Sequence, residues 1–441
     1  MKILLTSLAA RGHAIADALV RSPQNPEIIS IVPAKNPGIA ALASEQFVAD
    51  LMDFDAVLDI AKKVQPDFAF VAPDDPIGAG LVDALEEIGI KSVAPQKKLA
   101  QIESSKSFAR ELLCKHQIDA SPKFRCISKS NTSDIHEYLD ELEGNYVIKY
   151  DALKGGKGVK VSGEHLHSID EGVAYAIECI EECGRVVIEE KLIGVEFSLL
   201  SFVSGTQVVD MPAVQDHKRA YEGDTGPNTG GMGTYSDSNH SMPFLSDADL
   251  DAAKKLNQQT ADSLLIECGE SFKGILYGGF IATKKGIQLI EYNARFGDPE
   301  ALNILPLLES DFVDICQGII NEELTEDMVS FAKKATVCKY ITPESYPESK
   351  DNRGEAVTLP DVGPDARIYL GDISESDDGS LLLGGSRTAG IVGIGDSIAQ
   401  AESIAQSLCE KVTGPVRFRT DIGTQSVIDK RIDLIEEVRK G

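Results

Sequence analysis

Two hydrophobic patterns alternate along the first 95 residues of the chain. Short apolar runs typical of buried strands are separated by segments whose apolar residues recur every three or four positions, as on one face of a helix. The expected strands are 3–6, 27–32, 68–71 and 92–94, and the expected helices are 13–21, 54–64 and 78–88. This alternation predicts a parallel sheet covered by helices, in which ligands bind at the carboxyl ends of the strands.

The pattern becomes mixed after Pro95, with short strands and isolated helices in place of a regular alternation. A helix carrying Lys106 precedes short strands in residues 121–190, and Ser246 is the expected N-cap of a long helix. The further strands expected are 186–190, 196–203, 275–283, 288–292, 336–341, 367–370 and 380–383, and the further helices are 247–269 and 395–411. We therefore expect a multidomain chain in which an α/β domain is followed by α+β domains.

A polar run interrupts these elements at Gln215–Gly233. It holds five glycines and both charge signs, with almost nothing to bury. A compact domain rarely keeps so long a connection without a function, because ordering each residue costs roughly 1–2 kcal/mol with little burial in return. We expect a loop without regular structure. Its composition leaves two interpretations open, a mobile surface loop and a loop that contacts a ligand.

Composition excludes several classes of function. A formal charge of −27 argues against nucleic acid and anionic membranes as partners, whereas small phosphorylated ligands need only local cations. The eight cysteines show no Cys-x2-Cys pair and the seven histidines no metal-binding spacing, so neither a zinc site nor a disulfide framework is expected. No apolar stretch approaches the roughly 18 residues of a membrane span, so we expect a cytoplasmic protein. The excess of carboxylates suits a high-salt cytoplasm.

A strand, a turn rich in glycine and lysine, and a second strand follow one another in residues 147–159. The turn contains Gly155, Gly156 and Gly158 together with Lys157. The backbone amides and the lysine of such a loop are able to fold over a polyphosphate. The motif is not a Walker A loop, because neither Ser nor Thr follows the lysine, and a simple hairpin turn is the alternative interpretation.

A second polar motif occupies residues 290–300. Alternation on a strand puts Glu291 and Asn293 on one face, about 7 Å apart. One carboxylate and one amide oxygen suit Mg²⁺ that keeps waters and phosphate oxygens in its other positions. Arg295 has the same parity, and its planar guanidinium suits a carboxylate or a transferring phosphate. The alternative is an edge strand whose polar face is solvated.

The order of these features resembles that of the ATP-grasp ligases, in which two α+β lobes clamp ATP. The residues that carry this resemblance are Lys106, Lys149, Lys157, Glu189, Glu190, Lys191, Glu196, Glu291 and Asn293. Within that superfamily, the chain resembles the phosphoribosylamine-glycine ligase family over essentially its whole length. This closer resemblance rests on residues 74–83, 215–233, 295–300, 384–387 and 419–423.

The resemblance implies a division of the chain into three domains. Residues 1–103 would form the Rossmann-like parallel-sheet domain on the phosphoribosylamine side. Residues 104–325 would form the ATP-grasp lobes, with a lid around 121–190, and residues 326–441 a small mixed α+β domain. The expected assembly is a monomer or a weak homodimer.

The resemblance also implies an activity. This is the ATP-dependent ligation of glycine to 5-phosphoribosylamine through a glycyl phosphate, giving glycinamide ribonucleotide, ADP and phosphate in the second step of de novo purine synthesis. The expected ligands are ATP, glycine, 5-phosphoribosylamine, and Mg²⁺ or Mn²⁺. Catalysis by alignment and electrostatics needs no nucleophilic side chain, so His217 is expected to be structural or to position other groups.

Individual roles follow by similarity. ATP would be bound by Lys106, Lys149, Lys157, Gly155, Gly156, Gly158, Glu189, Glu190, Lys191 and Glu196. The metal would be bound by Glu291 and Asn293. The catalytic residues would be Asp216, Lys218 and Arg295 together with Lys157. The other substrates would contact Arg11, His13, Asp216, Arg295, Gly297 and Asp298.

The first loop departs from the family pattern. The family has a glycine-rich turn followed by Arg-Glu-His-Ala, whereas this chain has Ser7–Ala14, which keeps the arginine and the histidine but places Gly12 at the glutamate position. A positive φ at Ala9 or Ala10 would cost on the order of 1 kcal/mol. Because that loop holds the phosphate of phosphoribosylamine in the family, an ATP-dependent ligase with a different amine acceptor is an alternative. A non-catalytic nucleotide-binding protein is another.

Overall fold

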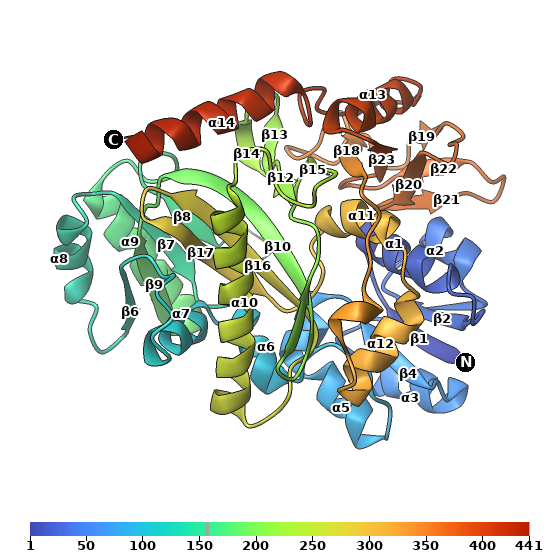
Figure 1. The fold of residues 1–441 in the computed structure, drawn as a ribbon, viewed down its shortest axis with the longest axis horizontal. Coiled ribbons are helices and arrows are strands. Elements are labelled where there is room, and N and C mark those ends of the chain that lie inside the picture. Colours follow the sequence, from blue (N-terminus) through green and yellow to red (C-terminus); the bar gives the residue numbers. More distant parts are fainter. Residues whose placement is uncertain (155–157, 441) are drawn as a thin grey trace.

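The computed structural model describes residues 1–154 and 158–440, and the chain begins with the expected parallel sheet (Figure 1). The strand order is β3-β2-β1-β4-β5, and every neighbouring pair is parallel. The strands are β1 (Lys2–Thr6), β2 (Glu27–Val32), β3 (Glu45–Val48), β4 (Phe68–Val71) and β5 (Ser92–Val93). The helices between them are α1 (Ala9–Val20), α2 (Pro37–Leu42), α3 (Phe54–Val64), α4 (Asp74–Ala79) and α5 (Leu81–Glu87). The single helix expected at 78–88 is wrong, because Gly80, with φ +107°, separates α4 from α5.

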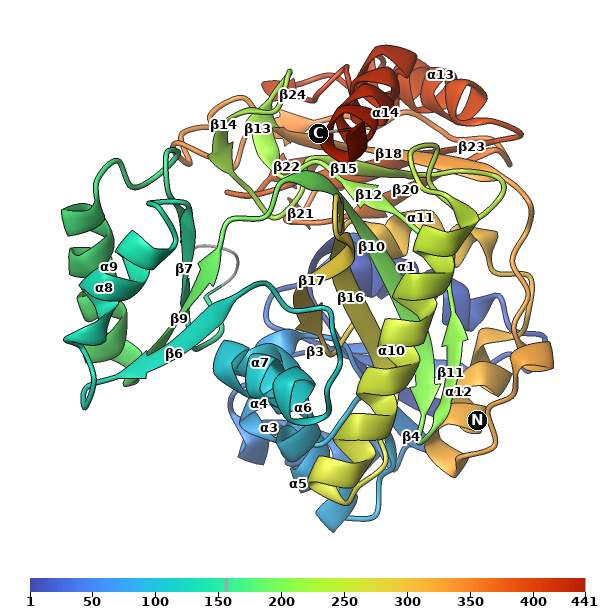
Figure 2. The ribbon, with the colours of Figure 1, turned by 60° about the vertical axis from the view of Figure 1, so that its left-hand side comes forward.

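A second, antiparallel sheet forms a small lobe, which Figure 2 shows at the left of the molecule. Its order is β6-β9-β7-β8. The strands are β6 (Phe124–Ser128), β7 (Tyr146–Tyr150), β8 (Val159–Val161) and β9 (Arg185–Glu190), with helices α8 (Asp134–Glu141) and α9 (Ile169–Cys183) packed on them. Helices α6 (Lys97–Ser104) and α7 (Lys106–Lys115) precede this lobe in the chain.

A third sheet, of order β11-β10-β16-β17, carries the longest strands. Its strands are β10 (Gly194–Ser204), β11 (Gln207–Asp210), β16 (Lys273–Thr283) and β17 (Gly286–Asn293). Helix α10 (Asp247–Cys268) packs against it, followed in the chain by α11 (Glu300–Ile304) and α12 (Phe312–Asn321). The expected N-cap is confirmed, because the Ser246 side chain accepts a hydrogen bond from the backbone N–H of Asp249 and the two residues form a capping box.

A fourth sheet joins the polar run 215–233 to the C-terminal part of the chain. Its order is β12-β15-β18-β23-β20, and β24 also pairs with β18. The strands are β12 (Gln215–Asp216), β15 (Gly233–Ser236), β18 (Ala335–Pro343), β20 (Ala366–Leu370), β23 (Ala389–Gly395) and β24 (Val416–Arg417). Helix α13 (Ile398–Cys409) covers β18 and β23, and α14 (Gln425–Lys440) ends the chain.

The expectation that residues 215–233 lack regular structure is therefore wrong. Besides β12 and the start of β15, the run contains a small hairpin of β13 (Arg219–Tyr221) and β14 (Thr225–Asn228). The backbone of β15 is paired on both sides, by β12 and by β18. A further small sheet consists of β19 (Ala356–Val357), β21 (Ile373–Glu375) and β22 (Leu381–Leu383).

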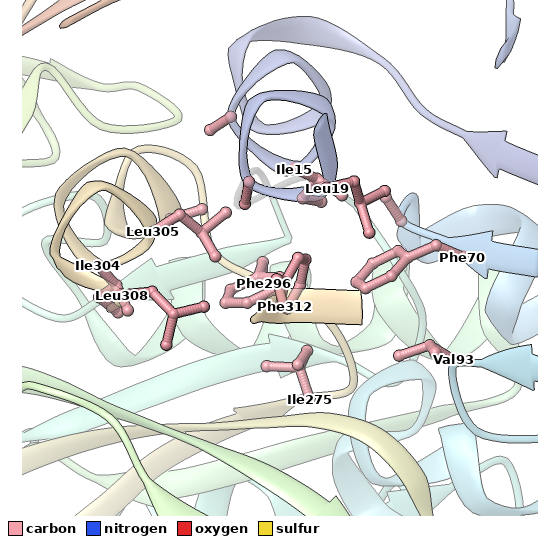
Figure 3. Packing of buried hydrophobic residues seen from close by; sticks show 14 of the residues in the cluster. Ile15, Leu19, Phe70, Val93, Ile275, Phe296, Ile304, Leu305, Leu308 and Phe312 are labelled. Atoms are coloured by element: carbon pink, nitrogen blue, oxygen red, sulfur yellow. The ribbon is translucent and has the colours of Figure 1, made fainter. Parts of the chain in front are cut away.

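One extensive hydrophobic core joins the first sheet to the third (Figure 3). Ile15 and Leu19 on α1 lie near Phe70 on β4, while Phe296 and Phe312 come from the segment that follows β17. The Phe70 and Phe296 rings are 6.4 Å apart and nearly parallel. Because the core is continuous, the segment after β17 is fixed against the carboxyl ends of the first strands. No helix within residues 1–154 and 158–440 is long and apolar enough to cross a bilayer.

Candidate active site

Lys149 and Glu189 form a buried ion pair on neighbouring strands, β7 and β9. Lys149 Nζ lies 2.8 Å from Glu189 Oε2 and donates to the carbonyl of Ile290 at 2.9 Å. Arg110 on α7 binds the same carboxylate, with Nε 2.7 Å from Oε1, and its Nη2 also donates to the Ile290 carbonyl at 2.9 Å. The carboxylate of Glu189 is therefore directed at two cations within the protein, and the three side chains connect the small lobe to β17.

The charges of this buried group stabilise one another. Burial would raise the pKa of Glu189, but Arg110 and Lys149 hold it below its usual value. Burial lowers the pKa of Lys149, and the neighbouring Glu189 opposes this effect. Removing Glu189 would leave two uncompensated cations in the protein interior, which is strongly unfavourable, whereas without Lys149 the carboxylate of Glu189 would still pair with Arg110.

Glu291 and Asn293 lie near the carboxyl end of β17, where two basic side chains approach. Lys106 Nζ, at the start of α7, is 3.2 Å from Glu291 Oε2. Arg295 Nη2 donates to the Asn293 amide oxygen at 3.4 Å. Burial would raise the pKa of Glu291, but Lys106, Lys218 and then Lys149 hold it far below its usual value, so the carboxylate stays charged.

This pair of oxygen donors fits a divalent cation that shares its coordination with substrate. Among the described residues there is no group of three or more His, Cys, Asp or Glu side chains that could hold a metal ion. Mg²⁺ commonly takes only one or two protein oxygens and completes its shell with water and phosphate oxygens. The charged carboxylate of Glu291 and the amide oxygen of Asn293 meet that requirement.

The loop residues Asp216 and Lys218 approach the same region from β12. Lys218 Nζ is 3.8 Å from Glu196 Oε2 on β10. Partial desolvation would lower the pKa of Lys218, whose side chain is 44% exposed, but Glu196 and Glu291 raise it above its usual value. Burial and the nearby Glu300 carboxylate raise the pKa of Asp216 well above its usual range. The structure thus brings Lys218 together with Glu291 and Lys106, although the sequence places them far apart.

Arg295 is held by carboxylates of the N-terminal half of the chain. Its Nη2 lies 2.8 Å from Glu103 Oε1 on α6 and 3.8 Å from Asp74 Oδ2 on α4. The second oxygen of Glu103 accepts a hydrogen bond from the backbone N–H of Ala294 at 2.7 Å. Burial would lower the pKa of Arg295, but Glu103 and Asp74 raise it, so the guanidinium is a fixed positive charge.

Gly297 and Asp298 begin the turn that leads to α11. The Gly297 carbonyl accepts from the Ala301 N–H at 3.1 Å. Asp298 accepts hydrogen bonds from Tyr340 Oη at 2.5 Å and from the backbone N–H of Arg11 at 3.2 Å, and Arg387 Nη1 lies 3.2 Å from it. Asp298 therefore connects the first turn of α1 to the fourth sheet.

The N-terminal loop contains a positive φ at an alanine, which is a costly backbone geometry for an L residue. Ala9 has φ +59°, in the left-handed region that favours glycine. A Cβ on Gly12 would lie 2.6 Å from the Cβ of Ser7, so no side chain fits at position 12 beside this serine. Glycine at position 12 therefore fits beside Ser7, whereas the glutamate that the family has at this position would clash with it.

The two side chains expected to bind substrate in this loop make contacts within the protein. Arg11 Nη1 donates to the Phe296 carbonyl at 2.7 Å. His13 Nδ1 accepts from the Leu370 N–H at 2.9 Å, and its ring meets Tyr369 edge-on at 5.4 Å. Burial lowers the pKa of His13 to about 4, so the ring is neutral near pH 7.

The remaining nucleotide-binding candidates lie around the small lobe. Lys191 Nζ donates to the Ser162 carbonyl at 3.1 Å, and Glu190 accepts from the Lys123 N–H at 3.0 Å. Glu190 also lines a cavity of about 620 Å³ next to α10. Gly158 directly precedes β8, and its carbonyl accepts from the Tyr150 N–H at 2.8 Å. Gly155, Gly156 and Lys157 lie outside the described residues.

His217, which is expected to be structural or to position other groups, is buried. Its ring is 1% exposed, and burial lowers its pKa to about 4. Within residues 1–154 and 158–440 neither ring nitrogen has a hydrogen-bond partner. The neutral ring packs beside Tyr235, with 5.9 Å between the ring centroids.

Sequence reasoning missed several charged residues of the site. Arg110 had a usable signal, because it follows Lys106 by four positions and so shares a helix face with it. Glu103 had none, since it is a single acid within an otherwise ordinary helix pattern, whereas Glu300 ends the motif 290–300 but was given no role. Both are 3% exposed, which only the tertiary structure reveals.

Comparison with known proteins places this geometry in a family. Three protein-family models of phosphoribosylglycinamide synthetase match the chain: the N domain at residues 1–103, the ATP-grasp (A) domain at 104–301 and the C domain at 336–425. The chain belongs to this family. The phosphoribosylamine-glycine ligase of Methanosarcina barkeri is 45% identical over 439 residues, covering 100% of both chains. That of Methanocaldococcus jannaschii is 43% identical, again with 100% coverage of both chains.

A solved structure agrees with the sequence relatives. The crystal structure of phosphoribosylamine-glycine ligase from Thermotoga maritima superposes with a TM-score of 0.79 at 26% identity. The match covers 96% of this chain and 100% of that one. The family resemblance inferred from the motifs is therefore confirmed, together with the mixed α/β and α+β fold that it implied.

Proposed function

We propose that this protein is an ATP-dependent carbon–nitrogen ligase that joins glycine to 5-phosphoribosylamine, forming glycinamide ribonucleotide, ADP and phosphate. The observation that carries the proposal is the convergence of Lys106, Lys149 and Lys218 on the charged carboxylate of Glu291. Phosphoryl transfer needs fixed cations and a metal-binding carboxylate around the transferring group. Membership in a synthetase family argues against a non-catalytic nucleotide-binding protein.

The chemistry assigned to this site is activation followed by attack. A glycine carboxylate oxygen attacks the γ-phosphorus of ATP, ADP leaves, and glycyl phosphate forms. The amine of phosphoribosylamine then attacks the acyl carbon, phosphate leaves, and the amine loses a proton. A divalent cation, Mg²⁺ or Mn²⁺, would be held by Glu291 and Asn293 and would neutralise phosphate charge.

The protein side chains would act by holding charge in place. Lys106 and Lys149 would bind phosphate oxygens, and Glu189 would position Lys149 through their buried ion pair. Glu190, Lys191 and Glu196 would contact the nucleoside, with the glycine-lysine turn of residues 155–158 over the phosphates. Asp216, Lys218 and Arg295 would position glycine and its acyl phosphate, since the fixed positive charges of Lys218 and Arg295 suit a carboxylate and a phosphate.

Two amine acceptors are candidates for this site, 5-phosphoribosylamine and a different amine. Gly297 and Asp298, together with Arg11 and His13, would form the phosphoribosylamine end of the site at the start of α1. A different amine acceptor is favoured by one observation: the backbone N–H of Arg11, in the first turn of α1, already donates to the Asp298 carboxylate. A substrate phosphate at that helix terminus would have to share or replace this contact.

One assay distinguishes these functions. We would measure ADP formation by the purified protein with ATP, Mg²⁺ and glycine, with and without freshly generated phosphoribosylamine. Full turnover that requires both substrates is the expected result. ADP formation that needs glycine but is unchanged by phosphoribosylamine would point to the other acceptor, and no glycine-dependent ADP at all would exclude the ligase.

A further inference from the structure

The polar run 215–233 is held in place by arginines from the C-terminal part of the chain. Arg419 is the main one and is 1% exposed. Its Nη1 donates to the Arg219 carbonyl at 3.0 Å and lies 2.9 Å from Asp224 Oδ1. Its Nε and Nη2 bind both oxygens of Asp421, at 2.9 and 2.7 Å. A single buried guanidinium therefore joins the loop to the segment after β24.

Neighbouring residues repeat this connection. Arg417 Nη1 donates to the Ala220 carbonyl at 2.8 Å, so alternate arginines of one segment bind consecutive carbonyls of β13. Asp421 also accepts from the backbone N–H of Gly223 at 2.9 Å. Arg431 on α14 binds the second oxygen of Asp224. Figures 1 and 2 both show β13 and β14 beside the C-terminal elements.

The far end of the loop is attached in the same manner. Arg387 Nη1 donates to the carbonyls of Gly230 and Gly231, at 2.7 and 3.0 Å. The same nitrogen donates to the Asp298 carbonyl at 3.1 Å. The loop is thus bound at both ends by guanidinium groups, with Asp216 and Lys218 just before the first attachment.

We infer that Arg419 is a positioning residue for the ligation reaction, acting through Lys218. The carbonyl that it binds belongs to Arg219, the residue directly after Lys218. Fixing that carbonyl fixes the direction in which Lys218 extends towards Glu196 and Glu291. This inference rests on the proposed function and adds to it that the C-terminal segment sets the geometry of the glycine end of the site.

The arrangement requires an arginine. A guanidinium offers five N–H groups in one plane, which suits a carboxylate on one edge and other acceptors on another. A lysine has the same charge but only three N–H groups on one nitrogen, so it cannot reproduce the four contacts that the planar guanidinium makes with both Asp421 oxygens, Asp224 and the Arg219 carbonyl. Arg419→Lys therefore keeps the positive charge in the buried site and loses part of the hydrogen-bond arrangement.

The test compares Arg419→Lys with wild type in glycine-dependent ADP formation. Small displacements of positioning groups reduce rates by as much as about 100-fold, so we expect kcat/KM for glycine to fall roughly 10- to 100-fold. The fall should be mostly a rise in the KM for glycine, while the KM for ATP stays within about twofold, since Lys106 and Lys149 are untouched. A purely structural defect would instead lower the apparent kcat, because a smaller fraction of the protein is active, and would leave both KM values unchanged.

A control and a second variant complete the test. Arg367→Lys is the matched control, because Arg367 also donates to backbone carbonyls of the C-terminal part, those of Pro364 and Ala366, but does not bind the loop. It should behave like wild type. Asp224→Asn weakens the same attachment from the loop side, at a partly exposed residue, and should reproduce the selective rise in the KM for glycine even if Arg419→Lys fails to fold.

The outcomes separate this inference from the proposed function. Wild-type protein without glycine-dependent ADP formation overturns both. If the wild type is active and folded Arg419→Lys has an unchanged KM for glycine, only the positioning role is overturned. If Arg419→Lys does not fold, an unchanged KM for glycine in Asp224→Asn has the same consequence. Faster hydrogen exchange of the amides in 219–231 in the same variant, with other regions unchanged, is the expected structural counterpart.

Discussion

Ala9 offers a direct measurement of backbone strain at the start of α1. Its φ of +59° costs an L side chain about 1–2 kcal/mol. Glycine at this position removes that cost, but it also gives the unfolded chain about 0.4–1 kcal/mol of additional conformational freedom. The midpoints of these ranges predict that Ala9→Gly raises the free energy of unfolding by about 0.8 kcal/mol.

The neighbouring alanine is the matched control. Ala10 has a helical backbone and is 0% exposed in the core beneath α1. Ala10→Gly loses about 0.8 kcal/mol of methyl burial and about 1 kcal/mol of helix propensity, so it should lower the free energy of unfolding by about 2 kcal/mol. The same chemical change at adjacent positions is therefore expected to have opposite signs.

The assay is thermal unfolding followed by circular dichroism. With an unfolding entropy of about 2.1 cal/mol/K per residue, the 441-residue chain would gain about 1 °C in Tm from Ala9→Gly and lose about 2 °C from Ala10→Gly, if it unfolds as one unit. Urea titration provides an independent measure of the sign. A Tm that falls by similar amounts in both variants would show that Ala9 carries no strain.

Four further predictions concern the candidate active site and the net charge of the protein. Glu291→Ala should reduce ligation by far more than tenfold with the fold retained, and a loss under about 1.4 kcal/mol of barrier in steady-state assays would contradict a metal ligand. Lys149→Met should raise the KM for ATP, and an unchanged value would remove its phosphate role. The pKa of His13 is about 4 in the folded protein and 6.5 in a free histidine, so between these values the unfolded chain binds a proton that the folded protein excludes. The Tm should therefore fall as the pH is lowered from 6.5 to 4.5. The fall should be smaller in His13→Gln. Added KCl should raise the Tm by screening a net charge of −27, and a Tm that is flat from low to molar salt would exclude the high-salt interpretation.

Local patterns predicted the elements that depend on local physics. The strand at 27–32 and the helix at 54–64 have the expected bounds, since their periodicity and capping residues are contained within the segment itself. Ser246 was identified as an N-cap for the same reason. The order of Lys149 and Glu291 along the chain indicated the family because both lie in strand motifs that are recognisable one at a time.

Long-range pairing could not be predicted in this way. The strands β12 and β15 hold few apolar residues and depend on β18, about a hundred positions further along the chain, for their stability. Nothing in residues 215–233 alone indicates that partner, so the sequence predicted a loop there. Glu189 is a similar case, because its buried partner Arg110 comes from a helix in another part of the chain.

The pairing of β15 with β18 makes two of the family-matched segments, 104–301 and 336–425, structurally dependent on one another. A shortened chain that ended before Ala335 would leave β15 as an exposed edge strand, with unpaired N–H and C=O groups that favour aggregation. It would also lack the four C-terminal arginines that bind residues 219–231, which are Arg387, Arg417, Arg419 and Arg431. The C-terminal segment is thus part of the scaffold of the candidate active site, and we expect sequence changes within it to alter the KM for glycine as well as folding.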